Sequence, residues 1–247
     1  MNRNFVIATI LALMVLSAGR SGVPPAMNPS PLGSGVVRGT VKFAGAASKR
    51  AHISMSADPD CARLHPGGVN AEDVVTDGGG GLQNVIVFVS AGLGDRTFDP
   101  PSQPVVFEQR GCEYQPHVVA MWTNQTLDVM NRDKTTHNMH PLPANNPEWN
   151  KSQPPGQAIE VTFPREEIAI PVKCNLHPWM RSYVAVFKHP YFALTGENGS
   201  FELSHLPPGV YTIEAWHEKF GRATQTVTIG GSETKELSFV FKNQLGH

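Results

Sequence analysis

Short segments in which every second residue is apolar recur along the chain, and they constrain its fold more than any other feature. They cover residues 36–43, 85–89, 127–130, 158–163, 168–172, 183–187, 201–203, 211–216, 224–229 and 237–241. Successive side chains of a strand point to opposite faces of a sheet, so a period of two predicts strands. Turns rich in Gly, Pro and Asn separate the segments, and the chain shows no long amphipathic helical pattern. We therefore expect an all-β chain built of sandwiches.

The last third of the chain has a signature of its own. It contains Thr195-Gly-Glu-Asn-Gly-Ser-Phe201 and then Leu206-Pro-Pro-Gly-Val-Tyr211. This pattern resembles the carboxypeptidase regulatory-like domain, a small transthyretin-like β-sandwich. Two features typical of that family's opening strands lie far upstream, at Gly39-Thr-Val41 and at residues 84–89. The resemblance implies one sandwich formed by residues 36–99 and 190–241, with a second domain at 104–189 inserted between them. The alternative is a set of domains in series.

The beginning of the chain is typical of an export signal. Arg3 precedes an apolar run over residues 5–18, and the small residues 17–19 at its end would suit cleavage. We expect a signal peptide at 1–19, a linker at 20–35, and a periplasmic or otherwise exported protein. An uncleaved membrane anchor is the alternative, but the run is short for a bilayer span, and no later apolar run is long enough to span.

The charge balance excludes one broad class of function. The chain has 20 Lys and Arg residues against 21 Asp and Glu residues. Proteins that bind nucleic acid mainly through charge need a basic excess. We expect no nucleic-acid partner, and function must therefore depend on a local site.

One seven-residue segment carries metal-binding chemistry, namely Cys174-Asn-Leu-His177-Pro-Trp-Met180, with His137 far upstream. A thiolate, two imidazoles and a thioether suit copper that alternates between Cu(I) and Cu(II). A zinc site would more often use paired Cys or His elements and would not need Met180. His140 is the rival for the upstream position, but a residue three places along a strand faces away from His137.

These residues resemble the cupredoxin family, in particular its amicyanin type, whose ligand loop reads Cys-x2-His-Pro-aromatic-Met. The resemblance covers residues 104–189 and implies a Greek-key sandwich of the blue type 1 copper proteins. It implies one copper ion bound by His137, Cys174, His177 and Met180. Asn138 would steady the ligand loop, and residues 107–119 would form an early strand of the domain.

The resemblance also implies how electrons reach the metal. In this family the imidazole edge of the loop histidine reaches solvent within an apolar patch. Here that electron port would be His177 with Trp179. Lys173 and Arg181 flank it in the sequence, so a redox partner with an acidic docking patch is expected.

With Cys174 assigned to the metal, the chain has Cys61 and Cys112 left over. An exported protein is expected to pair its remaining cysteines, so we expect a Cys61–Cys112 disulfide. The alternative is two free, buried thiols.

The predicted function is electron transfer by an exported mononuclear copper protein. The alternative is copper binding for delivery or storage, without electron transfer. An enzyme is not expected, because the sequence has neither a His-x-His pair nor a Gly-x-Ser-x-Gly motif.

Overall fold

The computed structural model describes residues 32–45 and 49–243. The expected signal peptide at 1–19 and most of the linker at 20–35 lie outside these ranges. Within them no helix has the length and apolar character needed to cross a bilayer. The regular secondary structure of the described residues is nearly all strand, which confirms the predicted all-β class.

The first sandwich is formed by two sheets that enclose one core. One sheet has the order β15-β1-β18 and the other β14-β4-β16-β17. The strands are β1 (Gly35–Phe43), β4 (Ile86–Ala91), β14 (Phe192–Leu194), β15 (Ser200–Leu206), β16 (Gly209–His217), β17 (Gly221–Ile229) and β18 (Thr234–Phe241). Buried aliphatic and aromatic side chains from both sheets, such as Val41, Val87, Ile213 and Phe239, fill the space between them.

The second sandwich also has two sheets, with the orders β10-β9-β12-β13-β7 and β11-β8-β5-β6. The strands are β5 (Val105–Arg110), β6 (Glu113–Gln115), β7 (Val118–Trp122), β8 (Leu127–Asn131), β9 (His137–Pro141), β10 (Lys151–Gln153), β11 (Ala158–Val161), β12 (Glu167–Lys173) and β13 (Arg181–Phe187). Its core includes Phe107, Val129, Val184 and Met180. This core therefore reaches the predicted ligand loop.

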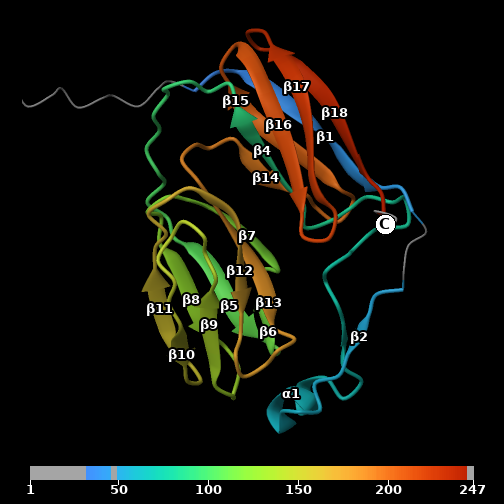
Figure 1. Ribbon diagram of the computed structural model, residues 1–247, viewed down its shortest axis with the longest axis vertical. Coiled ribbons are helices and arrows are strands. Elements are labelled where there is room, and N and C mark those ends of the chain that lie inside the picture. Colours follow the sequence, from blue (N-terminus) through green and yellow to red (C-terminus); the bar gives the residue numbers. More distant parts are fainter. Residues whose placement is uncertain (1–31, 46–48, 244–247) are drawn as a thin grey trace, which may run out of the picture.

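The two sandwiches lie next to each other (Figure 1), and a third apolar cluster fills the space between them. Ile86 and Phe88 of β4 belong to this cluster, whereas Val87 between them faces the first core. Phe187 of β13 lies opposite, with its ring centroid 5.2 Å from that of Phe88. Because these two strands are buried on both faces, the four sheets form four stacked layers.

A segment between β1 and β4 leaves the first sandwich and reaches the far end of the second (Figure 1). It contains β2 (His52–Ile53), the helix α1 (Pro59–Leu64) and β3 (Val69–Asn70). Asp58 caps α1, and Pro59 follows at the first helical turn, where proline is favoured. A helix of six residues has little stability of its own. A disulfide between Cys61 of α1 and Cys112 holds it against the second sandwich.

The expected single strand over residues 107–119 is wrong. The chain reverses after β5 at Gly111 and Cys112, whose φ angles are 66° and 55°. Two consecutive residues with positive φ form the type of two-residue turn that joins hairpin strands. Arg110 accordingly pairs with Glu113 across β5 and β6, and β7 then joins the opposite sheet.

The strand order supports the proposal that the second sandwich is inserted into the first. The first sandwich takes β1 and β4 from before the second sandwich and β14 to β18 from after it. The likeness of this interrupted sandwich to the carboxypeptidase regulatory-like domain stays a prediction.

This arrangement predicts the effect of removing the end of the chain. β1 pairs with β15 and β18, and β4 pairs with β14 and β16. Deletion of residues 190–247 removes all four of these partners, so we expect amide hydrogens of β1 and β4 to lose their protection in hydrogen exchange. A fragment 36–188 that keeps β1 protected would instead favour domains in series.

Two buried histidines, His189 in the link between β13 and β14 and His217 of β16, predict how the stability of the protein depends on pH. Burial lowers the pKa of His189 and of His217 to about 4 from 6.5. Both are neutral in either state above pH 6.5, whereas between pH 6.5 and 4 mainly the unfolded chain takes up protons. Each should therefore reduce the free energy of unfolding by up to about 1.4 kcal/mol per pH unit as the pH falls through this window.

The check is urea unfolding between pH 7 and 4 of the wild type, His189→Asn and His217→Asn. Asn keeps a short acceptor for the Tyr191 and Lys219 amides that bond to these rings. Each variant should flatten the pH dependence, whereas His52→Asn at an exposed position should not. Equal slopes in all four proteins would contradict the assignment.

Candidate metal centre

The predicted ligand loop lies between β12 and β13 and is closed by its own backbone. The Met180 amide donates to the His177 carbonyl at 2.9 Å, and the Cys174 amide donates to the Met180 carbonyl at 3.2 Å. His137 is the first residue of β9, which pairs with β12 at Lys173 and His140. The tight loop and the neighbouring strand therefore bring residues 40 positions apart together.

Three predicted ligands form one cluster of donor atoms. His137 Nδ1 and His177 Nδ1 are 2.9 Å apart, and Cys174 Sγ is 3.6 Å from His177 Nδ1. One ligand atom from each of the three residues lies within 4.8 Å of the others. The residues are 0%, 2% and 3% exposed for His137, Cys174 and His177, so the cluster is closed to solvent.

The opposite nitrogen of each imidazole contacts a carboxylate. His137 Nε2 lies 2.9 Å from Asp133 Oδ2, and His177 Nε2 lies 3.1 Å from Asp58 Oδ2. A carboxylate accepts hydrogen bonds, so each Nε2 carries a proton and donates it. In the neutral rings both Nδ1 atoms then present lone pairs to each other.

This donor set fits a metal cation. Two lone pairs 2.9 Å apart in a buried site repel each other unless a positive charge, from a proton or a metal ion, lies between them. Metal–nitrogen bonds of about 2 Å allow one ion to bind both nitrogens. A carboxylate on the remaining imidazole nitrogen is the usual support of a histidine ligand. With a thiolate beside them, the imidazoles suit copper or zinc.

The surroundings of Cys174 lower the pKa of its thiol. Burial raises the pKa of Cys174, but hydrogen bonds involving His137, Asn138 and His177 outweigh burial and lower it to about 7. Burial also disfavours the charged forms of His137 and Asp133, yet their mutual hydrogen bond raises the pKa of His137 and helps to lower that of Asp133. These directions favour the thiolate of Cys174, the carboxylate of Asp133 and a positive charge at His137, which a proton or a metal ion can supply.

Met180, the fourth predicted ligand, lies in the core of the second sandwich. It ends the ligand loop, is 1% exposed and belongs to the same core cluster as Cys174. The Met180 thioether is therefore available as a further ligand at this end of the second sandwich.

Asn138 lies beside the loop, whereas His140 lies outside the donor cluster. Asn138 Oδ1 accepts from the Asn175 amide at 2.7 Å and from Cys174 Sγ at 3.3 Å. His140 instead contacts Asn175 and Glu148 through its two ring nitrogens. The alternation of the strand separates it from His137, as expected.

The remaining cysteines are paired. Cys61 and Cys112 form a disulfide, and Cys174 is the free cysteine. The disulfide borders the donor cluster, since Cys61 groups with His177 and Cys112 groups with His137 within 4.8 Å.

The expected electron port at His177 is wrong. His177 is 3% exposed, and Asp58 at the start of α1 covers its outer nitrogen. Trp179 is half-buried: its indole N–H donates to the Cys112 carbonyl at 3.0 Å, and its ring centroid lies 5.2 Å from that of His177. The segment between β1 and β4 covers the face of His177 that the resemblance to cupredoxins predicted to be open to solvent.

Sequence reasoning missed both carboxylates. Asp133 lies four residues before His137, a spacing that could have indicated it. Asp58 is separated from His177 by 119 residues, and its only local signal is the Asp-Pro start of a helix. That signal predicts a cap and says nothing about the distant histidine.

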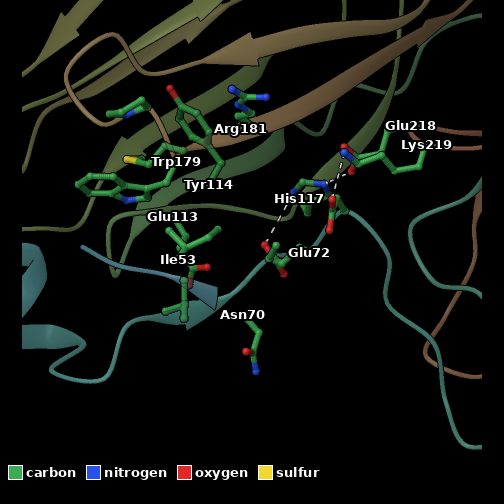
Figure 2. Close-up of a pocket in the computed structure, with 15 residues that line it drawn as sticks. Ile53, Asn70, Glu72, Glu113, Tyr114, His117, Trp179, Arg181, Glu218 and Lys219 are labelled. Carbon is green, nitrogen blue, oxygen red and sulfur yellow. Dashed lines mark hydrogen bonds and ion pairs between the residues drawn. The ribbon is translucent and has the colours of Figure 1, made fainter. Parts of the chain in front are cut away.

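A cavity of about 250 Å³ lies beside Trp179 and Met180 (Figure 2). His117 points into it between Glu218, whose Oε1 is 2.5 Å from Nε2, and Glu72, whose Oε2 is 3.8 Å from Nδ1. Burial opposes the charged form of His117, but the two glutamates raise its pKa. Glu72 belongs to the segment between β1 and β4, and Glu218 belongs to the first sandwich. His117 of the second sandwich therefore connects both to its own sandwich, and it is not part of the donor cluster.

A second cavity, of about 550 Å³, reaches Cys174 from another side. Its lining includes Leu142, Lys173, Arg181 and Tyr183, and none of its lining residues is acidic. This cavity is therefore a positively charged hollow that is bordered by Cys174 of the cluster.

No family model matches the chain, and no curated protein matches it. Among solved structures it is similar to a copper-containing nitrite reductase from Thermus scotoductus, with 19% identity and a TM-score of 0.33 over 41% of this chain and 25% of that one. A purple cupredoxin from Nitrosopumilus maritimus is 20% identical with a TM-score of 0.29, over 33% of this chain and 98% of that one. An oxidised amicyanin mutant is 21% identical with a TM-score of 0.31, over 40% of this chain and 90% of that one. The chain thus spans a quarter of the nitrite reductase, and each likeness covers less than half of this chain.

Proposed function

We propose that the chain binds one copper ion through His137, Cys174, His177 and Met180 and transfers electrons. The observation that carries this proposal is the pair of imidazole Nδ1 atoms 2.9 Å apart, beside a free thiol and closed off from water. Bound copper supplies one-electron chemistry, and the thiolate and thioether suit Cu(I) while the imidazoles serve both oxidation states.

The anchoring of the donors favours electron transfer over delivery of the metal. Asp133 and Asp58 hold the imidazoles, and Asn138 contacts the thiol, so the same arrangement serves both oxidation states with little movement. Delivery to another protein would require the donors to be accessible, yet each is at most 3% exposed. The same burial keeps a substrate away from the metal, which disfavours an enzyme.

The colour of the copper-loaded protein tests this proposal. Cu(II) bound by the Cys174 thiolate should give an intense visible charge-transfer band that disappears on reduction while copper stays bound. Cys174→Ser should lose the band. Met180→Gln should keep it and change the reduction potential, because the axial ligand tunes the potential. A Cys174→Ser protein with unchanged colour would contradict the ligand assignment.

We further propose that electrons enter through the cavity that Cys174 lines. His177 is covered, whereas Lys173 and Arg181 surround this second approach to the cluster. Leu142, 36% exposed, adds apolar surface to the same cavity. A partner with an acidic rim and an apolar centre would fit this surface.

Oxidation of the reduced protein by ferricyanide, an anionic probe, tests the position of this surface. Lys173→Glu and Arg181→Glu should each slow the reaction several-fold near 0.01 M ionic strength, and the difference should shrink near 0.15 M, where charges are screened over about 8 Å. Lys42→Glu, on β1 of the first sandwich, is the matched control and should have little effect. Equal rates for all variants at low salt would exclude this entry surface.

A further inference from the structure

The carboxylate that covers His177 comes from outside the second sandwich. Asp58 Oδ1 accepts the amides of Asp60 and Cys61 at 2.8 and 3.0 Å, as a helix cap does. Its other oxygen, Oδ2, faces His177 Nε2 at 3.1 Å and Thr135 Oγ1 at 3.2 Å. One side chain therefore starts α1 and binds the predicted copper ligand.

The surrounding contacts fix Asp58 in this position. The disulfide joins α1 at Cys61 to the hairpin at Cys112, and His65 just after α1 bonds to the Gly111 carbonyl at 2.9 Å. The same hairpin donates its Gly111 and Cys112 amides to Asp133 at 2.7 and 2.8 Å. The two carboxylates are thus held by one turn, each against one histidine.

We propose that Asp58 is a positioning residue of the copper site, which aims His177 at the ion and lowers the reduction potential. This inference rests on the proposed copper function. Asp58 keeps the proton on Nε2 of His177, so that Nδ1 is free to bind metal. Its negative charge stabilises Cu(II) more than Cu(I), because the interaction grows with the charge of the ion.

Asp58 lies where its negative charge acts strongly on the proposed copper site. Its side chain is 22% exposed, and its partner His177 is 4% exposed at the side chain, so little water separates the charge from the site. Asp60 on the same helix is a matched comparison, since its side chain is 37% exposed and pairs with Arg63. Removal of either residue's charge changes the net charge equally, but only Asp58 contacts a predicted ligand.

The test compares Asp58→Asn and Asp58→Ser with Asp60→Asn in the full-length, copper-loaded protein. Asn and Ser cap helices well, so both Asp58 variants keep the start of α1. Asp58→Asn removes the negative charge but keeps a side chain of the same length. Asp58→Ser leaves a side chain that is too short to reach His177. The measurements are the reduction potential and the affinities for Cu(II) and Cu(I).

We expect both Asp58 variants to bind Cu(II) about tenfold or more weakly, in line with other residues that support metal ligands. The preference for Cu(I) over Cu(II) should rise about tenfold, which is about 59 mV for a one-electron couple. Asp60→Asn should differ from the wild type by less than about threefold, as expected for an exposed ion pair.

Two results would overturn the inference, and they have different meanings. If the wild type shows the thiolate-to-copper band but the Asp58 variants match Asp60→Asn in potential and affinity, Asp58 has no positioning role and the proposed function stands. If the wild type shows no such band, the proposed function fails and the inference fails with it.

Discussion

The contact between each predicted ligand imidazole and its carboxylate is the interaction on which the proposed metal centre depends. Asp133 and Asp58 keep protons on the outer nitrogens of His137 and His177, which leaves the inner nitrogens as bare acceptors 2.9 Å apart. In a buried site this arrangement is costly without a cation. Binding of a metal ion would offset that cost, so the proposed function couples metal affinity to the stability of this end of the sandwich.

A two-residue turn organises the surroundings of the site. Gly111 and Cys112 donate their amides to Asp133, and Cys112 fixes α1 through the disulfide and accepts the Trp179 indole N–H. Because each contact is made by a different group of the same turn, a local change there would disturb both histidines. The positive φ angles of both residues are what allow the turn, and they also explain why the strand expected at 107–119 is interrupted.

The sequence could predict what depends on local pattern. Alternating apolar residues located most strands, and the spacing of Cys174, His177 and Met180 placed three candidate ligands in one loop. Asn138 followed from the resemblance to a known loop.

What depends on contacts between distant segments could not be predicted. Asp58 reaches His177 only because the segment between β1 and β4 crosses to the other sandwich and a disulfide holds it there. No periodicity or spacing encodes that path, so the covering of His177 was missed, and the electron port was expected on a face that is closed.

The central claim is that one copper ion is bound by one sulfur of Cys174 and by the two imidazoles. X-ray absorption spectroscopy at the copper edge of the loaded protein tests this most directly, because it identifies the atoms bound to the metal in both oxidation states. The account predicts one thiolate sulfur and two imidazole nitrogens in oxidised and reduced protein alike, with the sulfur lost in Cys174→Ser. A copper site with only nitrogen and oxygen neighbours, or one unchanged by that substitution, would contradict it.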